Sequence, residues 1–147
     1  MPEHIRLRFG ALPWQPGDDS TLSTAYDRHD RPVSGLLDQR GQLYLFDCIE
    51  GHAWDVNVWV YTPVTNADAD KLADAEGREF AGLVDRIVKR GPTTAALAVA
   101  DRLEMALPIK PDAIGKDLYT GIMDIVLTKI EAAPTTAKEL RKLQLTR

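Results

Sequence analysis

The chain has 147 residues and a single cysteine, Cys48. One cysteine excludes an internal disulfide, and a low cysteine content is typical of proteins in a reducing compartment. The opening residues MPEHIRLRFG lack the apolar stretch of a secretory signal peptide. No segment approaches the run of about 18 apolar residues that a transmembrane helix requires. We therefore expect a cytoplasmic protein without a membrane partner.

The sequence also lacks the motifs that carry common catalytic chemistry. It has no G-x-S-x-G nucleophile elbow, no P-loop and no G-x-G-x-x-G dinucleotide fingerprint. The metal-ligand spacings C-x-x-C, H-x-x-x-H and H-x-H are missing as well. We therefore expect no cofactor and no resident metal. The balance favours a protein that is not an enzyme, although these absences alone do not exclude one.

An excess of positive charge is absent too, since the formal net charge is -4. Proteins that neutralise nucleic-acid phosphates normally carry a basic surface or stripe. The clearest basic segment is KELRKLQLTR at residues 138–147, which we interpret as the solvated face of a short helix. Nucleic acid is thus not the expected partner, and contact through this segment is the weakest of three functional hypotheses.

What is present is the composition of an ordinary folded domain, with 44% hydrophobic and 27% charged residues. A chain of this length suits one domain, so we predict a single domain over residues 1–147. The many Ala, Asp, Arg and Val residues are typical of GC-rich bacterial genomes. The pattern changes near Pro63: residues 1–64 read as mainly β and residues 65–147 as helical. Strands followed by helices predict an α+β fold.

The β part predicts a small, bent antiparallel sheet of four or five strands, either open or partly closed into a barrel. Alternating apolar residues or bulky β-formers mark its strands, which we place at residues 4–9, 32–37, 42–49 and 55–62. The polar segment DRHDRP, which precedes the second of these, is interpreted as a surface connection that enters the strand at Pro32.

Both faces of the hairpin formed by 42–49 and 55–62 are apolar. Because side chains alternate along a strand, one face carries Leu45 with Val58 and the other carries Phe46 with Trp59. A hairpin that is apolar on both sides must be covered on both sides. We expect the helices to cover one face and the rest of a curled sheet to cover the other.

The second half predicts three helices and a short fourth. Apolar spacings of three and four residues, with capping and Pro signals, place them at residues 66–90, 94–106 and 112–133, with the fourth opening near Thr136. The helix 112–133 is apolar over much of its circumference. We therefore expect it either to be central or to contact another protein or a second copy of the chain.

The stretch DCIEGHAWD concentrates groups that bind metals or transfer protons. Asp47, Glu50, His52 and Asp55 are the candidate ligands or acid–base residues of a metal-assisted hydrolase at a hairpin tip. The simpler interpretation makes the last three solvated turn residues and Cys48 a small buried hydrophobe.

Asp47 stands apart from its neighbours because it lies in an otherwise apolar row. A buried carboxylate is costly unless it is paired or hydrogen-bonded. Two interpretations follow. In the first, turn amides or an arginine such as Arg40 form hydrogen bonds with the Asp47 carboxylate. In the second, Asp47 lines a pocket and has a perturbed pKa.

Two tryptophans, Trp14 and Trp54, fall in predicted loops. Exposed tryptophans are frequent anchors of protein interfaces, so these two are the candidates for a binding surface. The leading hypothesis is therefore a non-catalytic interaction or regulatory module, with the helix 112–133 as its candidate interface for a partner or for oligomerisation. The metal-assisted hydrolase is the alternative.

Overall fold

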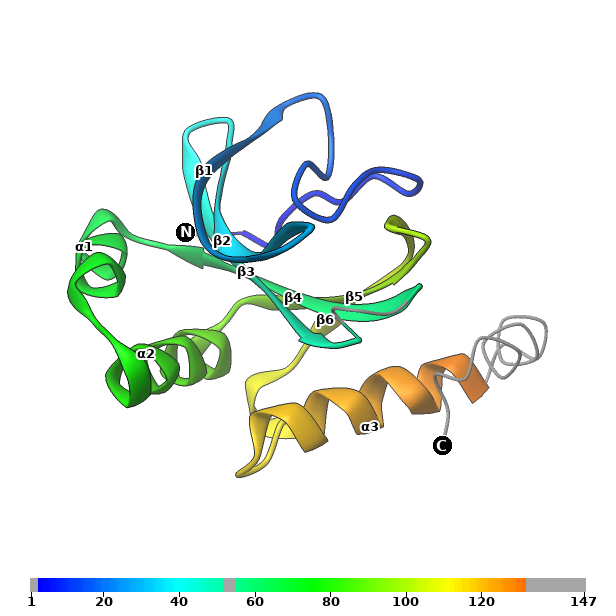
Figure 1. Ribbon diagram of the computed structural model, residues 1–147. Coiled ribbons are helices and arrows are strands. Elements are labelled where there is room, and N and C mark those ends of the chain that lie inside the picture. The colour runs from blue at the N-terminus through cyan, green and yellow to red at the C-terminus, as the bar shows by residue number, and fades with distance from the viewer. Residues whose placement is uncertain (1–2, 52–54, 132–147) are drawn as a thin grey trace.

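The structure is a computed structural model that describes residues 3–51 and 55–131. Six strands form one antiparallel sheet in the order β1-β2-β3-β4-β5-β6, and the helices lie outside it (Figure 1). The strands are β1 (Ser20–His29), β2 (Arg31–Gln39), β3 (Gln42–Glu50), β4 (Val56–Val64), β5 (Thr93–Val99) and β6 (Arg102–Ile109). The helices are α1 (Asn66–Asp74), α2 (Gly77–Arg90) and α3 (Leu118–Glu131), with a 3-10 turn at Pro111–Ala113.

The predicted α+β class is confirmed, but the strand count and the barrel are corrected. Six strands are present rather than four or five. In the described part of the chain, β1 and β6 do not pair with each other, so the sheet is open and not a barrel. Its curvature still brings β2 and β6 to one hydrophobic cluster, which contains Val33, Leu37 and Leu103.

The two faces of the sheet are covered by different parts of the chain. The helices pack on one face, where Leu72, Ile87 and Val126 join the core. The segment that precedes β1 crosses the other face, where Ile5 is buried and Trp14 packs against the aromatic cluster. The predicted double cover is therefore found, with an extended N-terminal segment contributing to one side.

The alternation predicted for β3 and β4 is confirmed residue by residue. Leu45, Val58 and Val60 belong to the cluster under the helices. Phe46 and Trp59 belong to the opposite cluster and lie with their ring centroids 6.1 Å apart. The register explains this division, because Phe46 lies opposite Tyr61 and Asp47 opposite Val60.

The predicted strand at residues 4–9 is wrong, and β1 was not predicted. Residues 4–8 have no regular secondary structure and Phe9 begins a turn. Arg6 bonds the side chain of Gln39, with its amide donating to Oε1 at 3.0 Å and its carbonyl accepting from Nε2 at 2.9 Å. The true first strand, β1, is an edge strand with mostly exposed side chains and irregular pairing. An edge strand of that kind needs no apolar row, so it leaves a weak sequence pattern.

The predicted helix at 94–106 is also wrong, because this segment forms β5 and part of β6. The residues read as helical by composition, since Ala and Leu are strong helix formers. In the sheet, Ala95 and Leu97 face the helices while Ala96 and Ala98 face the aromatic cluster. Small alanine side chains fit a central strand that lies beside the large residues of β4. Packing therefore outweighs the helix propensity of this segment.

The remaining helix predictions hold in part. The helix predicted at 66–90 is broken into α1 and α2, and its N-cap is Thr65 rather than Asn66. The helix predicted at 112–133 begins later, at Leu118, after a 3-10 turn. The predicted fourth helix lies outside the described residues. Because of β5 and β6, the second half of the chain is not purely helical.

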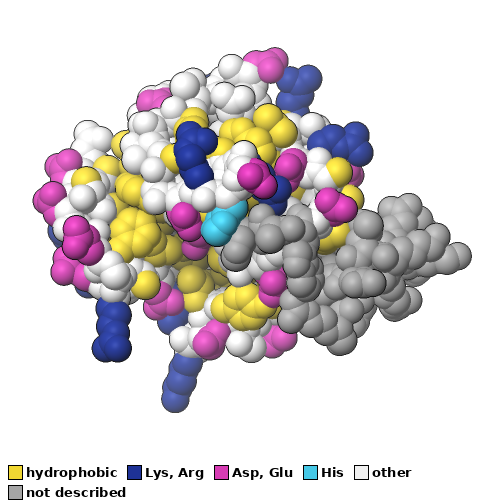
Figure 2. Space-filling model, in the orientation of Figure 1, with side chains coloured by type: hydrophobic (Ala, Val, Ile, Leu, Met, Phe, Trp, Pro, Cys, Tyr) yellow, Lys and Arg dark blue, Asp and Glu magenta, His cyan; other side chains and the backbone are white. Residues whose placement is uncertain are grey.

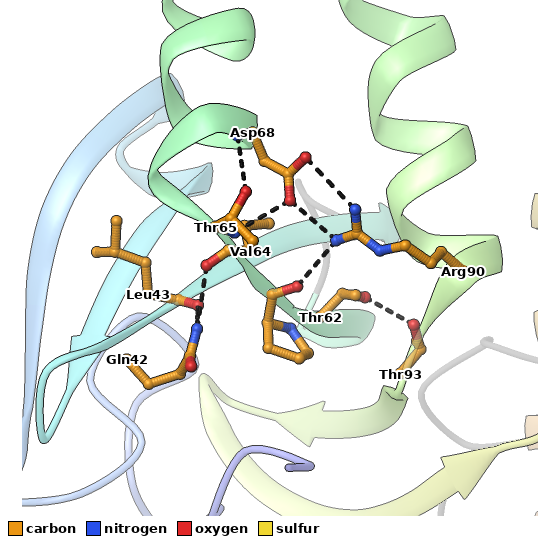
Figure 3. A network of polar contacts seen from close by, with 9 residues as sticks. Gln42, Leu43, Thr62, Val64, Thr65, Asp68, Arg90 and Thr93 are labelled. Carbon is orange, nitrogen blue, oxygen red and sulfur yellow. Dashed lines mark hydrogen bonds and ion pairs between the residues drawn. The ribbon is translucent and has the colours of Figure 1, made fainter. Parts of the chain in front are cut away.

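A polar network joins the start of α1 to the end of α2 (Figure 3). Thr65 and Asp68 form a capping box. Arg90 donates to Asp68 Oδ2 at 3.0 Å and to the Pro63 carbonyl at 3.2 Å. These bonds connect the two ends of the helical segment between β4 and β5 and thereby hold α2 over the sheet.

In the described residues, no helix is long and apolar enough to cross a bilayer.

Candidate functional site

Asp47 lies in the middle of β3 and faces the helices. It is flanked across the sheet by Ser34 on β2 and Val60 on β4. Its direction follows from period-two alternation with Leu45, which is buried on the same face. Its neighbours Leu45, Ile49 and Val60 on this face are apolar, so apart from Ser34 the strand positions around the carboxylate suit aliphatic side chains.

Two adjoining hollows open beside this carboxylate, with volumes of about 560 and 580 Å³. They share Ser34, Asp47 and Phe80, so we treat them together as the Asp47 groove. The first hollow is lined by Tyr26, Asp27, Ser34, Asp47, Leu72, Ala73, Ala75, Glu76, Gly77 and Phe80. The second is lined by Ser34, Asp47, Cys48, Ile49, Phe80, Ala81, Val84, Asp85, Asp117, Leu118 and Tyr119.

The groove combines apolar walls with acidic groups. Tyr26 and Phe80 meet edge to face with centroids 5.0 Å apart, and Tyr119 is 45% exposed at the other end. Figure 2 shows hydrophobic side chains gathered between α2 and the neighbouring strands, with acidic side chains beside them. The described lining residues include no Lys, Arg or His. The charged groups of the lining are therefore all acidic, and Lys89 contacts one of them, Asp85, from outside at 3.1 Å.

The carboxyl group of Asp47 has unusual electrostatics. Burial, together with the neighbouring Asp27 carboxylate, raises the pKa of Asp47 to about 7. Among the described residues, no side chain or backbone amide forms a hydrogen bond or ion pair with it. The expected partner Arg40 pairs instead with Asp19 at 2.9 Å. Of the two interpretations left open by the sequence, the structure favours a carboxylate with a perturbed pKa beside a hollow.

Cys48 points to the opposite side of β3 and is buried in the aromatic cluster. Its thiol donates to the Glu50 carbonyl at 3.4 Å. Burial, reinforced by the negative charge of Asp47, raises the pKa of the Cys48 thiol to about 12. A thiol in this environment remains protonated at neutral pH and is not an activated nucleophile.

The other hairpin candidates do not join Asp47 in the groove. Glu50 accepts a hydrogen bond from the Gly51 amide at 3.0 Å, and Asp55 is exposed. Neither lines the two hollows. His52 and Trp54 lie outside the described residues. Within the described chain, no three His, Cys, Asp or Glu side chains are placed to hold a metal ion.

Trp14 is only partly exposed, because it packs against the aromatic cluster on the far side of the sheet from the groove. Helix α3 buries Ile122, Val126 and Ile130 against the sheet, so much of its apolar surface serves the core of this chain. Its first turn, at Leu118 and Tyr119, reaches the groove.

Sequence reasoning missed most of the groove. Asp27 was assigned to the polar connection DRHDRP, Tyr26 to no element, and Phe80 only to the helix predicted at 66–90. These residues come from β1 and α2, which are far apart in the sequence. No local pattern signals their proximity to Asp47, because that proximity depends on how α2 is placed over β1, β2 and β3. The one signal available was the isolated carboxylate in an apolar strand.

No family model, curated protein or solved structure matches the chain, so its function is argued from the groove itself.

Proposed function

We propose that this protein is a non-catalytic interaction module that binds a partner protein in the Asp47 groove. The observation that carries the proposal is a partly buried carboxylate with a raised pKa and no described hydrogen-bonding partner at the boundary of two hollows. Polar groups in such positions are normally satisfied. A ligand that donates to Asp47 supplies the missing interaction.

The walls of the groove support binding to another protein. Phe80 lines both hollows, and Leu118 and Tyr119 extend the apolar surface along the second. Apolar and aromatic side chains supply most of the binding free energy at protein interfaces, while a few polar groups set orientation. The two hollows adjoin and are open to solvent, so neighbouring residues of one segment can occupy both.

Two features support binding over catalysis. The nearest sulfur nucleophile, Cys48, is held protonated on the other side of the strand. The described lining of the two hollows contains no histidine or lysine, and the nearest ones, His29 beside Asp27 and Lys89 beside Asp85, lie outside it. The metal-assisted hydrolase and the nucleic-acid contact through residues 138–147 stay predictions without a supporting observation.

The test is an unbiased selection of displayed peptides on the purified full-length protein. We expect the selected peptides to shift NMR signals of β3 and α2 residues and to lose affinity in Phe80→Ala. Arg78→Ala, an exposed change in the same helix, serves as the control and leaves affinity unchanged. Selected peptides that bind Phe80→Ala as tightly as the wild type, with shifts confined to other surfaces, contradict the proposal.

A further inference from the structure

We propose that the partner segment inserts an arginine side chain into the first hollow, against Asp47, and an apolar side chain into the second. This inference rests on the proposed function and names the chemistry of the occupant. It follows from the charge of the groove, the partial burial of Asp47 and the aromatic pair at its wall.

Charge complementarity is the first reason for a cation. Acidic side chains reach the groove from four parts of the fold: Asp27 on β1, Glu76 before α2, Asp85 on α2 and Asp117 before α3. The described lining contains no basic side chain. Just outside it, Lys89 contacts Asp85 at 3.1 Å and His29 contacts Asp27 at 3.6 Å, whereas Asp47 and Glu76 have no described ion pair. A cationic ligand is therefore attracted mainly at Asp47, with Asp27 and Glu76 lining the same hollow.

The position of Asp47 is the second reason, and it goes beyond general acidity. This carboxylate is partly buried and has no donor among the described residues. A charge-assisted hydrogen bond from a cation is stronger than one from a neutral donor, and more so where the bound ligand displaces water. The ligand thereby replaces the hydration that Asp47 lost when the chain folded.

The aromatic pair favours arginine over lysine. Tyr26 and Phe80 line the same hollow as Asp47 and Asp27. A guanidinium group stacks on aromatic faces and offers five donors in a planar fork, so it can bond carboxylates while its faces contact rings. An ammonium group is a strongly hydrated point charge without a flat face. The first hollow therefore suits arginine better.

The second hollow is the reason for placing an apolar side chain of the partner segment beside its arginine. Its walls include Ile49, Phe80, Val84 and Leu118, and Tyr119 stands exposed at its edge. Because Asp47 and Phe80 border both hollows, an arginine in the first places the adjoining residues of its chain beside the second. A small free cation would leave that apolar surface uncovered, so a peptide segment is the better fit.

The test uses synthetic peptide libraries in which one arginine and one leucine are fixed at varied separations. Matched libraries replace arginine with lysine or with citrulline, which keeps the shape of arginine without its charge. Binding to the full-length protein is measured by fluorescence anisotropy. We expect the arginine peptides to bind most tightly and the citrulline peptides to bind at least about tenfold more weakly.

Protein variants locate the effect. Asp47→Asn and Asp27→Asn should each remove most of the preference for arginine over citrulline. Asp70→Asn makes the same charge change on exposed surface of α1 and should leave the preference intact. Thermal unfolding of each variant confirms that it is folded, so a lost preference is read as a change in binding.

The outcomes separate this inference from the proposed function. Equal binding of arginine and citrulline peptides, with affinity still lost in Phe80→Ala, overturns the arginine but leaves the groove as a binding site. Failure of both this test and the display selection overturns both. Free arginine amide that binds as tightly as the peptides would make the occupant a small cation and overturn the peptide segment.

Two other occupants are tested with the full-length chain. A second copy would show as self-association that Asp47→Asn abolishes, and this result overturns the inference. The chain's own basic end would show as tighter peptide binding when Arg141 and Lys142 are both changed to Gln. That result also overturns it.

Discussion

Asp47 and Asp68 are two carboxylates whose surroundings move their pKa values in opposite directions. Burial and the Asp27 carboxylate raise the pKa of Asp47 to about 7. Burial also acts to raise the pKa of Asp68, but hydrogen bonds from Arg90 and Thr65 outweigh it and the pKa is lowered. The charge of Asp47 therefore opposes folding, while the charge of Asp68 supports it.

Replacing Asp47 with asparagine should stabilise the protein in a pH-dependent way. Between the ordinary aspartate pKa near 4 and the folded value of about 7, folded Asp47 keeps a proton that the unfolded chain has released. The free energy of unfolding of the wild type therefore falls across this range, and Asn does not titrate. Urea unfolding measures the free energy of unfolding of both proteins. The value for Asp47→Asn minus the value for the wild type should increase by on the order of 2–4 kcal/mol as pH rises from about 4 to 8.

A difference between Asp47→Asn and the wild type that stays constant with pH would contradict the raised pKa. A stable variant would also show that the acid is kept at a cost in stability, as is common for residues retained for binding.

Replacing Asp68 with asparagine should have the opposite effect. The folded pKa of Asp68 lies below its unfolded value, so its stabilisation is present above about pH 4 and is lost as pH falls through the folded pKa. At neutral pH we expect Asp68→Asn to lower the free energy of unfolding by about 1–2 kcal/mol, because the bonds to Arg90 and the Thr65 amide weaken. Asp70→Asn, in the same helix, is the control for charge alone. Similar losses in both variants would refute the specific role of the network.

At the scale of elements, glycines decide how closely α3 can approach the chain before it. A Cβ at Gly121 would overlap the carbonyl group of Ile114, whose side chain is buried in the core. Gly82 in α2 is also helical, but a Cβ there meets nothing within 4 Å. Replacing each glycine with alanine therefore tests steric contact at Gly121 and helix propensity at Gly82.

Gly121→Ala should destabilise the protein, whereas Gly82→Ala should stabilise it. At Gly121 the added methyl group forces α3 away from the 3-10 turn, with an expected loss of about 1–3 kcal/mol. At Gly82 alanine improves helix propensity by about 0.5–1 kcal/mol. Thermal unfolding of both variants measures the contrast. Equal melting temperatures would show that α3 does not lie against Ile114 as described.

Elements also show where sequence patterns succeed. The hairpin of β3 and β4 was predicted with the correct faces, because its large side chains alternate. The β5–β6 hairpin was missed because alanines carry little pattern and its turn, Ala100-Asp101, is not a usual pair for two positive φ values. This segment is a strand because its small side chains fit between the large residues on both sides of β5.

At the scale of the whole molecule, one ion pair joins the ends of two hairpins. Arg31, at the start of β2, contacts Asp101 in the β5–β6 turn at 3.0 Å, and both side chains are partly buried. These residues are 70 positions apart and span the width of β3 and β4. The pair therefore holds the curvature of the sheet, together with the N-terminal segment that bonds Leu103 through the Gly10 amide and the Ala11 carbonyl.

Asp101→Asn should weaken this closure without disturbing the turn, because Asn tolerates a positive φ. We expect a loss of about 1–2 kcal/mol in the free energy of unfolding, since Arg31 keeps its charge in a partly buried place. Asp30→Asn is a matched control, because Asp30 also has a positive φ but is exposed at the β1–β2 turn. A loss at Asp30 equal to that at Asp101 would assign the effect to the turn and not to the ion pair.

The α+β class, the two faces of the central hairpin and the unusual position of Asp47 could all be predicted from the sequence, because they follow from the periodicity of side chains along the chain. That β5 and β6 are strands, and that Tyr26, Asp27 and Phe80 lie around Asp47, became clear only from the folded structure. Those contacts join β1, β3 and α2, and their geometry depends on the packing of the complete core rather than on any neighbouring residues.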